Sequence, residues 1–190
     1  MENLLAGAPK FPQSTALGSN MKSLLLLVLF STSSLAYSDN DVERIFGVHI
    51  GKPFKEAQIK LLGNRYLGDE APVKIIHAPA KSHYNGIFND FTMRISLFNG
   101  AVFQITTHRS FESSEQCITS LRQLSGQLSK DFNQKMNWSE QYQFQSKDKS
   151  RWLQLRCGQP VGSPYYILDL NLTDTAASVE LEKWFEEKTR

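Results

Sequence analysis

Apolar and polar residues alternate along several stretches of this chain, and the clearest stretch runs from Phe91 to His108. Successive side chains of a β-strand point to opposite faces of a sheet, so a two-residue alternation predicts strands with one buried face. Asn99 and Gly100 interrupt the alternation and predict the turn of a hairpin. Similar runs predict further strands over residues 45–50, 73–77, 138–145, 151–157 and 165–172.

The hairpin can be closed in two ways, and burial distinguishes them. A two-residue turn would place Ile95 opposite Gln104 and mix apolar with polar residues on both faces. A three-residue loop over residues 98–100, with Gly100 in the left-handed region, makes one face wholly apolar. We therefore predict the longer loop, with the pairs Leu97–Ala101, Ile95–Phe103 and Met93–Ile105.

Apolar residues spaced three and four apart predict three helices. Ser113 precedes the longest pattern and has Gln116 three residues on, a pairing that satisfies free amides at the start of a helix. A shorter pattern over residues 54–62 predicts a helix that Gly63 ends, and a third predicts a C-terminal helix that Asp174 caps. The apolar stripe of the longest helix consists of Cys117, Leu121, Leu124, Leu128 and Phe132.

The order of the predicted elements is a strand, a helix with three strands, a second helix with three strands, and a final helix. Short turns between strands imply antiparallel pairing, and a helix with a single apolar stripe needs a sheet face to cover. We therefore predict an α+β fold, a largely antiparallel sheet with helices packed on one face. The order also fits two αβββ-like units and a C-terminal helix, although no repeat of residues supports a duplication.

A secretory leader is predicted over residues 21–36, where a positive charge, a compact apolar run over 24–30 and small residues follow one another. Cleavage is expected after Ala36. The apolar run is too short to span a bilayer, which takes roughly 20 apolar residues. Residues 1–20 are interpreted as an upstream extension that is not part of the fold, with a regulated longer form as the other interpretation. Residues 37–190 then form a single α+β domain.

The composition is typical of a globular chain. Of the 190 residues, 41% are apolar and 21% are charged, and the formal net charge is +2. These values exclude a collagen-like, coiled-coil or low-complexity chain. So small a net charge produces no large field of one sign, and we therefore expect no nucleic-acid partner.

The two cysteines of the chain, Cys117 and Cys157, predict a disulfide because exported chains reach an oxidising compartment. Cys117 lies on the stripe of the long predicted helix, and Cys157 shares a strand face with Leu153 and Leu155, so the bond would join that helix to the sheet. Two separate buried thiols are the alternative interpretation. The spacing matches neither a Cys-x-x-Cys redox pair nor a zinc site.

Sequence motifs of the common catalytic and cofactor sites are missing. The chain contains no G-x-S-x-G, H-E-x-x-H, G-x-x-x-x-G-K-[ST] or G-x-G-x-x-G pattern, and its histidines are scattered without a pair at ligand spacing. We therefore assign no catalytic residue, no metal ligand and no cofactor. Asp90 and Asp169 could serve as a general acid or base if the fold brought either of them near His83 or His108.

One set of side chains predicts a binding surface. If Leu153 and its same-face neighbours point into the core, the alternate residues project from the opposite side of the sheet. These include large aromatics and arginines, which supply most binding energy at protein interfaces; the set is Trp152, Gln154, Arg156, Tyr165, Arg94 and His108. Solvation of that face, or cover by the terminal helix, is the alternative interpretation. Residues 81–91, with His83, Tyr84 and Phe88, form a second candidate, an adaptable loop.

These observations predict a periplasmic or secreted bacterial protein that binds a protein or a cell-envelope polymer, as an inhibitor-like module does, and catalyses no reaction. The alternative is a cell-envelope hydrolase whose carboxylate and histidine meet only in three dimensions. A structural or assembly factor is a third class. No membrane span is expected after cleavage of the leader, and the sequence leaves the oligomeric state open.

Overall fold

The structure is a computed structural model that describes residues 41–55, 59–66, 71–135 and 142–190. The chain divides into two units, Met1–Tyr37 and Ser38–Arg190, and everything described below belongs to the second unit. The predicted upstream extension and the predicted leader lie outside the described residues. Both therefore stay predictions.

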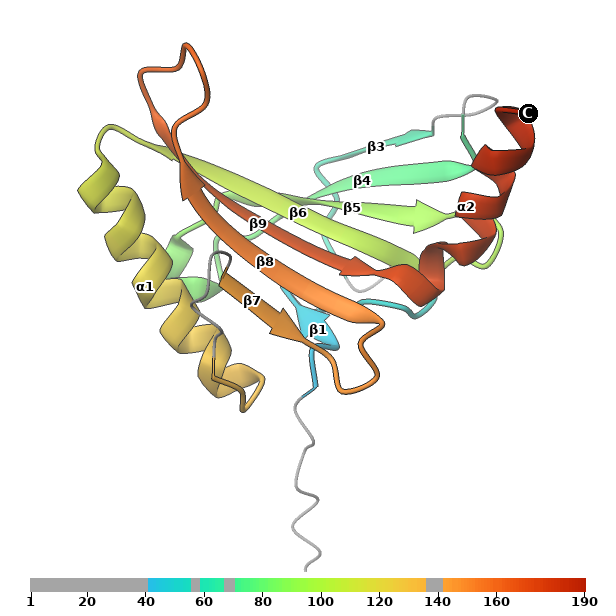
Figure 1. Ribbon diagram of the computed structural model, residues 1–190, viewed down its shortest axis with the longest axis horizontal. Coiled ribbons are helices and arrows are strands. Elements are labelled where there is room, and N and C mark those ends of the chain that lie inside the picture. The colour runs from blue at the N-terminus through green and yellow to red at the C-terminus, as the bar shows by residue number, and fades with distance from the viewer. Residues whose placement is uncertain (1–40, 56–58, 67–70, 136–141) are drawn as a thin grey trace, which may run out of the picture. The chain divides into compact units, whose positions relative to one another are not determined.

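The described residues form one seven-stranded sheet with the strand order β3-β4-β5-β6-β9-β8-β7, and a separate two-stranded hairpin (Figure 1). Every neighbouring pair in the large sheet is antiparallel, which confirms the predicted α+β fold with a largely antiparallel sheet. Its strands are β3 (Gly63–Tyr66), β4 (Val73–Pro79), β5 (Asp90–Ser96), β6 (Val102–Phe111), β7 (Tyr142–Gln145), β8 (Arg151–Gly158) and β9 (Tyr166–Asp174).

The long helix α1 (Ser114–Asp131) begins as the sequence predicts. The side chain of Ser113 accepts a hydrogen bond from the Gln116 backbone N–H (3.3 Å), which satisfies one of the free amides of the first turn. The predicted stripe is buried in one apolar cluster with residues of β6, β8 and β9, so α1 covers one face of the sheet. That stripe consists of Cys117, Leu121, Leu124, Leu128 and Phe132.

The C-terminal helix α2 (Thr175–Lys188) packs on the opposite face, which differs from the prediction that the helices share one face. Ile75 and Ile76 are neighbours on β4 and point to opposite sides. Ile76 lies in the cluster beneath α1, whereas Ile75 packs against a second cluster that contains Leu181 of α2. Figure 1 shows α2 at the far end of the sheet from α1.

A β-bulge explains how α2 finds apolar surface on that side. Met93 pairs with Ile105 as predicted, but the register shifts between Arg94 and Ile95, and Ile95 pairs with Val102 rather than Phe103. Phe103 is the extra residue, and its ring joins the cluster beneath α2. The turn spans residues 97–100, one residue more than predicted, and Gly100 adopts the expected positive φ of 69°.

Two N-terminal predictions need correction. The expected strand over residues 45–50 is a tight hairpin, β1 (Arg44–Ile45) and β2 (Val48–His49), which turns at Phe46 and Gly47. The described residues of the helix expected over residues 54–62 are not helical. The chain instead approaches the edge of β4, where Leu62 N donates to His77 O (2.8 Å), and continues as β3. Pairing with the open edge of β4 satisfies backbone groups that a helix would leave unpaired there.

The disulfide between Cys117 and Cys157 is present, as predicted. It joins α1 to β8, and the two Cα atoms are 6.1 Å apart. The bond therefore clamps the helix onto the face that it covers. Within the part of the chain that the structure describes, neither helix is long and apolar enough to cross a membrane.

Candidate functional site

The predicted surface residues of β8 point away from α1, because the leucines between them are buried beneath that helix. The sheet register fixes the neighbours of these residues. Gln154 lies opposite Asn171 of β9, and Arg156 lies opposite Asp169. His108 of β6 lies opposite Asp169 from the other side of β9. Residues from β6, β8 and β9 are therefore brought together on the face that α1 leaves open.

These side chains surround a depression of about 330 Å³, which we call the sheet-face hollow. An ion pair crosses it, with Arg156 Nη2 3.3 Å from Asp169 Oδ2. The Arg156 and Asp169 side chains are 72% and 40% exposed, so the hollow is open to solvent. Its lining residues are Thr106, Thr107, His108, Gln154, Arg156, Asp169, Leu170 and Asn171.

A row of hydrogen bonds between side chains leads into the hollow from β5. Arg94 Nη1 donates to Gln104 Oε1 (2.9 Å), and Gln104 Nε2 donates to Asn171 Oδ1 (3.0 Å). The Thr173 hydroxyl donates to the same oxygen (3.3 Å). These bonds engage the oxygen of the Asn171 amide, and its nitrogen is a donor at the lining of the hollow.

The other predicted surface residues do not line the hollow. Trp152 is half-buried opposite Thr173, two residues before Gln154 on the same face. Arg94 contributes through the hydrogen-bonded row. Tyr165 precedes β9 and belongs to the β8–β9 loop, where it is 49% exposed. The structure thus groups Gln154, Arg156 and His108 closely, places Trp152 beside them and leaves Tyr165 apart.

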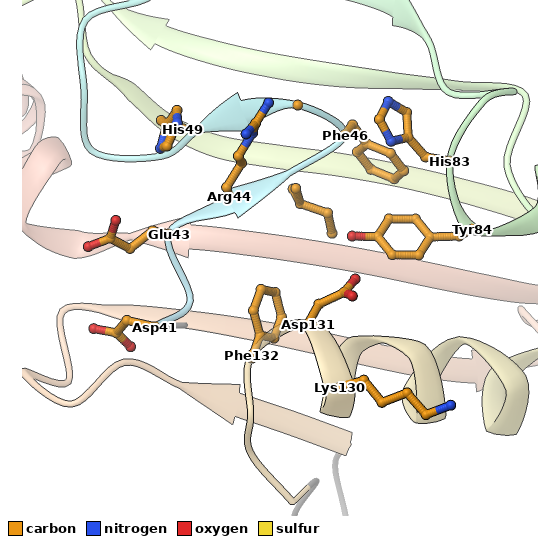
Figure 2. Close-up of a pocket in the computed structure, with 12 residues that line it drawn as sticks. Asp41, Glu43, Arg44, Phe46, His49, His83, Tyr84, Lys130, Asp131 and Phe132 are labelled. Carbon is orange, nitrogen blue, oxygen red and sulfur yellow. The ribbon is translucent and has the colours of Figure 1, made fainter. Parts of the chain in front are cut away.

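A second depression, of about 610 Å³, lies between the β1–β2 hairpin, the turn η3 (Tyr84–Gly86) and the end of α1. We call it the hairpin hollow. Figure 2 shows Tyr84 between two groups of side chains, with Phe46 and His83 on one side and Asp131 and Phe132 on the other. The rim of the hollow carries charges of both signs, from Asp41, Glu43, Arg44, Lys130 and Asp131.

The hairpin hollow has an aromatic floor and two titratable groups whose pKa values are raised. Phe46, whose φ is 51°, stacks on Phe91 with ring centroids 4.8 Å apart and meets Tyr84 edge to face at 5.4 Å. Burial, and secondarily the negative charge of Asp131, raise the pKa of Tyr84 far above its ordinary value, so the phenol stays protonated. Partial burial also raises the pKa of the Asp131 carboxyl.

The predicted adaptable loop contributes to this second hollow in part. His83 and Tyr84 line it, whereas Phe88 is wholly buried in the core. The strained backbone of Phe46 is offset by ring packing, because this side chain is 4% exposed and touches four other rings. Packing therefore accounts for the aromatic floor without a ligand.

Comparison with family models, with curated proteins and with solved structures finds no match to this chain. A functional proposal for this protein therefore depends on its sequence and on the geometry of its hollows. Among the described residues, no group of three or more His, Cys, Asp and Glu side chains could hold a metal ion.

Two important residues were missed at the level of sequence. Asn171 belongs to the sheet-face hollow, and the two-residue alternation along β9, which puts Asn171 on the same face as Asp169, could have identified it. Asp131 lies at the end of a helix, far in sequence from Phe46 and Tyr84, and no pattern in the chain relates them. Asp90, proposed as an alternative acid, lines neither hollow.

Proposed function

We propose that this protein is an exported binding or inhibitor-like module that engages its partner through the sheet-face hollow and catalyses no reaction. The observation that carries the proposal is the convergence of His108, Gln154, Arg156, Asp169 and Asn171 on one open face. A site built on neighbouring strands holds its side chains more rigidly than a site built on loops. The partner is a protein or a cell-envelope polymer.

Export is part of the proposal. The leader pattern over residues 21–36 and the Cys117–Cys157 bond both support a periplasmic or secreted location, because disulfides persist in oxidising compartments. The disulfide forms between residues that the fold buries or half-buries, which suits a permanent structural bond.

The hydrolase alternative has one observation in its favour, the opposed positions of His108 and Asp169 on neighbouring strands. Their surroundings favour binding instead. Asp169 is engaged by Arg156, and His108 is exposed, whereas acid–base catalysis gains from a site that excludes water. A hydrolase assay on cell-wall polymers with the His108→Ala variant as reference would reveal such an activity.

Affinity capture from an envelope extract tests the proposed function. The variant Trp152→Ala/Arg156→Ala should retain its partner at least tenfold less well than the unchanged protein, because it loses an aromatic anchor and a charged donor of the site. Lys183→Ala, on the exposed side of α2, is the matched control and should capture normally. Equal capture by all three proteins, with similar melting temperatures, would remove this face as the binding surface.

A further inference from the structure

We infer that the ligand of the sheet-face hollow is a carbohydrate chain, so that the polymer recognised is a glycan. This inference rests on the proposed function and names the class of its partner. It follows from the hydrogen-bonding groups in the hollow, from its charge, and from the place of its apolar side chains.

The groups of the hollow match hydroxyls, which both donate and accept hydrogen bonds. Asn171 and Asp169 are two residues apart on one strand, so their side chains lie on the same face. The Asn171 amide nitrogen can donate, and Asp169 has one carboxylate oxygen beyond the one that contacts Arg156. Thr106 and His108 add a hydroxyl and an imidazole from the adjacent strand. Neighbouring hydroxyls of one sugar ring would find donors and acceptors side by side.

The charge of the hollow favours a neutral ligand. Among the described residues that line the hollow, one carboxylate and one guanidinium are present, Asp169 and Arg156, and they form an ion pair at 3.3 Å. A polyanion such as a nucleic acid would need a run of unpaired cations along the groove. The described residues of the hollow likewise offer an acidic or basic peptide no unpaired carboxylate or guanidinium.

The distribution of apolar surface argues against a protein partner. Protein interfaces centre on buried aromatic or aliphatic anchors surrounded by a polar rim. Here the arrangement is reversed, because the centre is polar and the apolar groups lie at its two ends. Trp152 is half-buried beyond Gln154, and Ile167 is half-buried beyond Asp169. In this inference the exposed part of the Trp152 side chain packs against the C–H side of a second sugar ring.

The hollow is also organised before a ligand arrives. Its strands are joined by continuous ladders, and the row from Arg94 through Gln104 fixes the orientation of the Asn171 amide. A ligand therefore orders few side chains on binding, which lowers the entropic cost of association.

The test is titration of the protein, purified from the envelope of its host, with chitotetraose and cellotetraose, together with a printed array of bacterial glycans. An uncharged polar decapeptide serves as the peptide probe. Backbone amide shifts in β6, β8 and β9 report occupation of the hollow. We expect at least one glycan to bind, and Asp169→Ala and His108→Ala each to weaken that binding at least tenfold. Gln123→Ala, exposed on α1 and not part of the hollow, is the matched control and should bind normally.

Several outcomes would overturn the inference. These are no binding to any glycan, binding that both hollow variants leave unchanged at normal melting temperature, or occupation of the hollow by the peptide. Failure of the proposed function gives a different result. If no glycan binds but an envelope protein is still retained through Trp152 and Arg156, the inference fails and the proposed function stands.

Discussion

At the scale of single residues, Asp131 carries a charge that its surroundings disfavour. It ends α1, where the helix dipole places partial negative charge, and it lies beside the half-buried ring of Tyr84. Partial burial raises its pKa, so the folded state holds the proton more tightly than the unfolded chain does. An ionised Asp131 therefore destabilises the fold.

Asp131→Asn should stabilise the protein at neutral pH. Removing the unfavourable dipole interaction is expected to raise the free energy of unfolding by about 0.5 kcal/mol, a small figure because the residue is exposed. The gain should shrink as the pH falls through the raised pKa and vanish at about pH 3, where the wild-type carboxyl is largely protonated in both states. Urea unfolding at both pH values measures this.

Lys130→Gln is the control for this measurement, since it removes a charge that the same helix end favours. It should lower stability slightly at neutral pH. An Asp131→Asn variant that gained nothing at neutral pH, or that kept its full gain in acid, would contradict the electrostatic explanation.

At the scale of elements, α1 carries a weak point at Gly126. This residue is exposed in the middle of the helix, and a Cβ added there would meet nothing within 4 Å. Gly126→Ala should raise the free energy of unfolding by about 0.5–1 kcal/mol, because alanine loses less backbone entropy on forming a helix. Thermal unfolding followed by circular dichroism measures the gain.

Gly51→Ala provides the opposite case. Gly51 has a φ of 75°, and an added Cβ would overlap the Asp174 carboxylate that caps α2 and accepts a hydrogen bond from Arg151 Nε (2.9 Å). Gly162 shares the positive φ but has open space around it, so Gly162→Ala isolates the backbone contribution. We expect Gly51→Ala to be the more destabilising of the two when both are unfolded in urea. Equal losses of stability in the two variants would show that the Asp174 side chain moves away from the added Cβ at no cost in free energy.

The elements that were predicted correctly are those whose signals are local. The Ser113 cap, the stripe of α1 and the Asp174 cap each depend on residues within a few turns of helix. The bulge at Phe103 and the strand β3 depend on partners elsewhere in the fold, α2 in one case and the edge of β4 in the other. Sequence periodicity contains no information about such partners. For this reason the helix prediction over residues 54–62 was wrong for the residues of that range that the structure describes.

The candidate site divides in the same way. Alternation along β8 placed Trp152, Gln154 and Arg156 on one face correctly. The position of His108 opposite Asp169 could not be predicted in this way. It depends on the pairing register of β6 with β9, two segments far apart in the sequence, and that register is set by the assembly of the whole sheet. The hairpin hollow collects three distant segments and had no sequence signal beyond residues 81–91.

At the scale of the whole molecule, the two helices cover opposite faces of one sheet. The larger cluster beneath α1 fills one side, and the smaller cluster beneath α2 fills one end of the other. The uncovered remainder of that second face holds the sheet-face hollow. The binding surface is thus built by strands whose opposite side is packed against α1, and no residue of α1 lines it.

Removal of the disulfide should therefore separate stability from binding. Cys117→Ala/Cys157→Ala frees a loop closed across a sequence separation of 40 residues, which should lower the free energy of unfolding by about 2–4 kcal/mol. The hollow is formed by β6, β8 and β9, which continuous backbone ladders join to one another. A variant that remains folded should accordingly bind its partner as tightly as the unchanged protein does. Denaturant midpoints and titrations under conditions where both proteins are folded measure the two quantities independently. Loss of binding in a variant that is still folded would show that the contact of α1 with the sheet determines the geometry of the hollow. The functional site would then include α1 as well as the open face of the sheet.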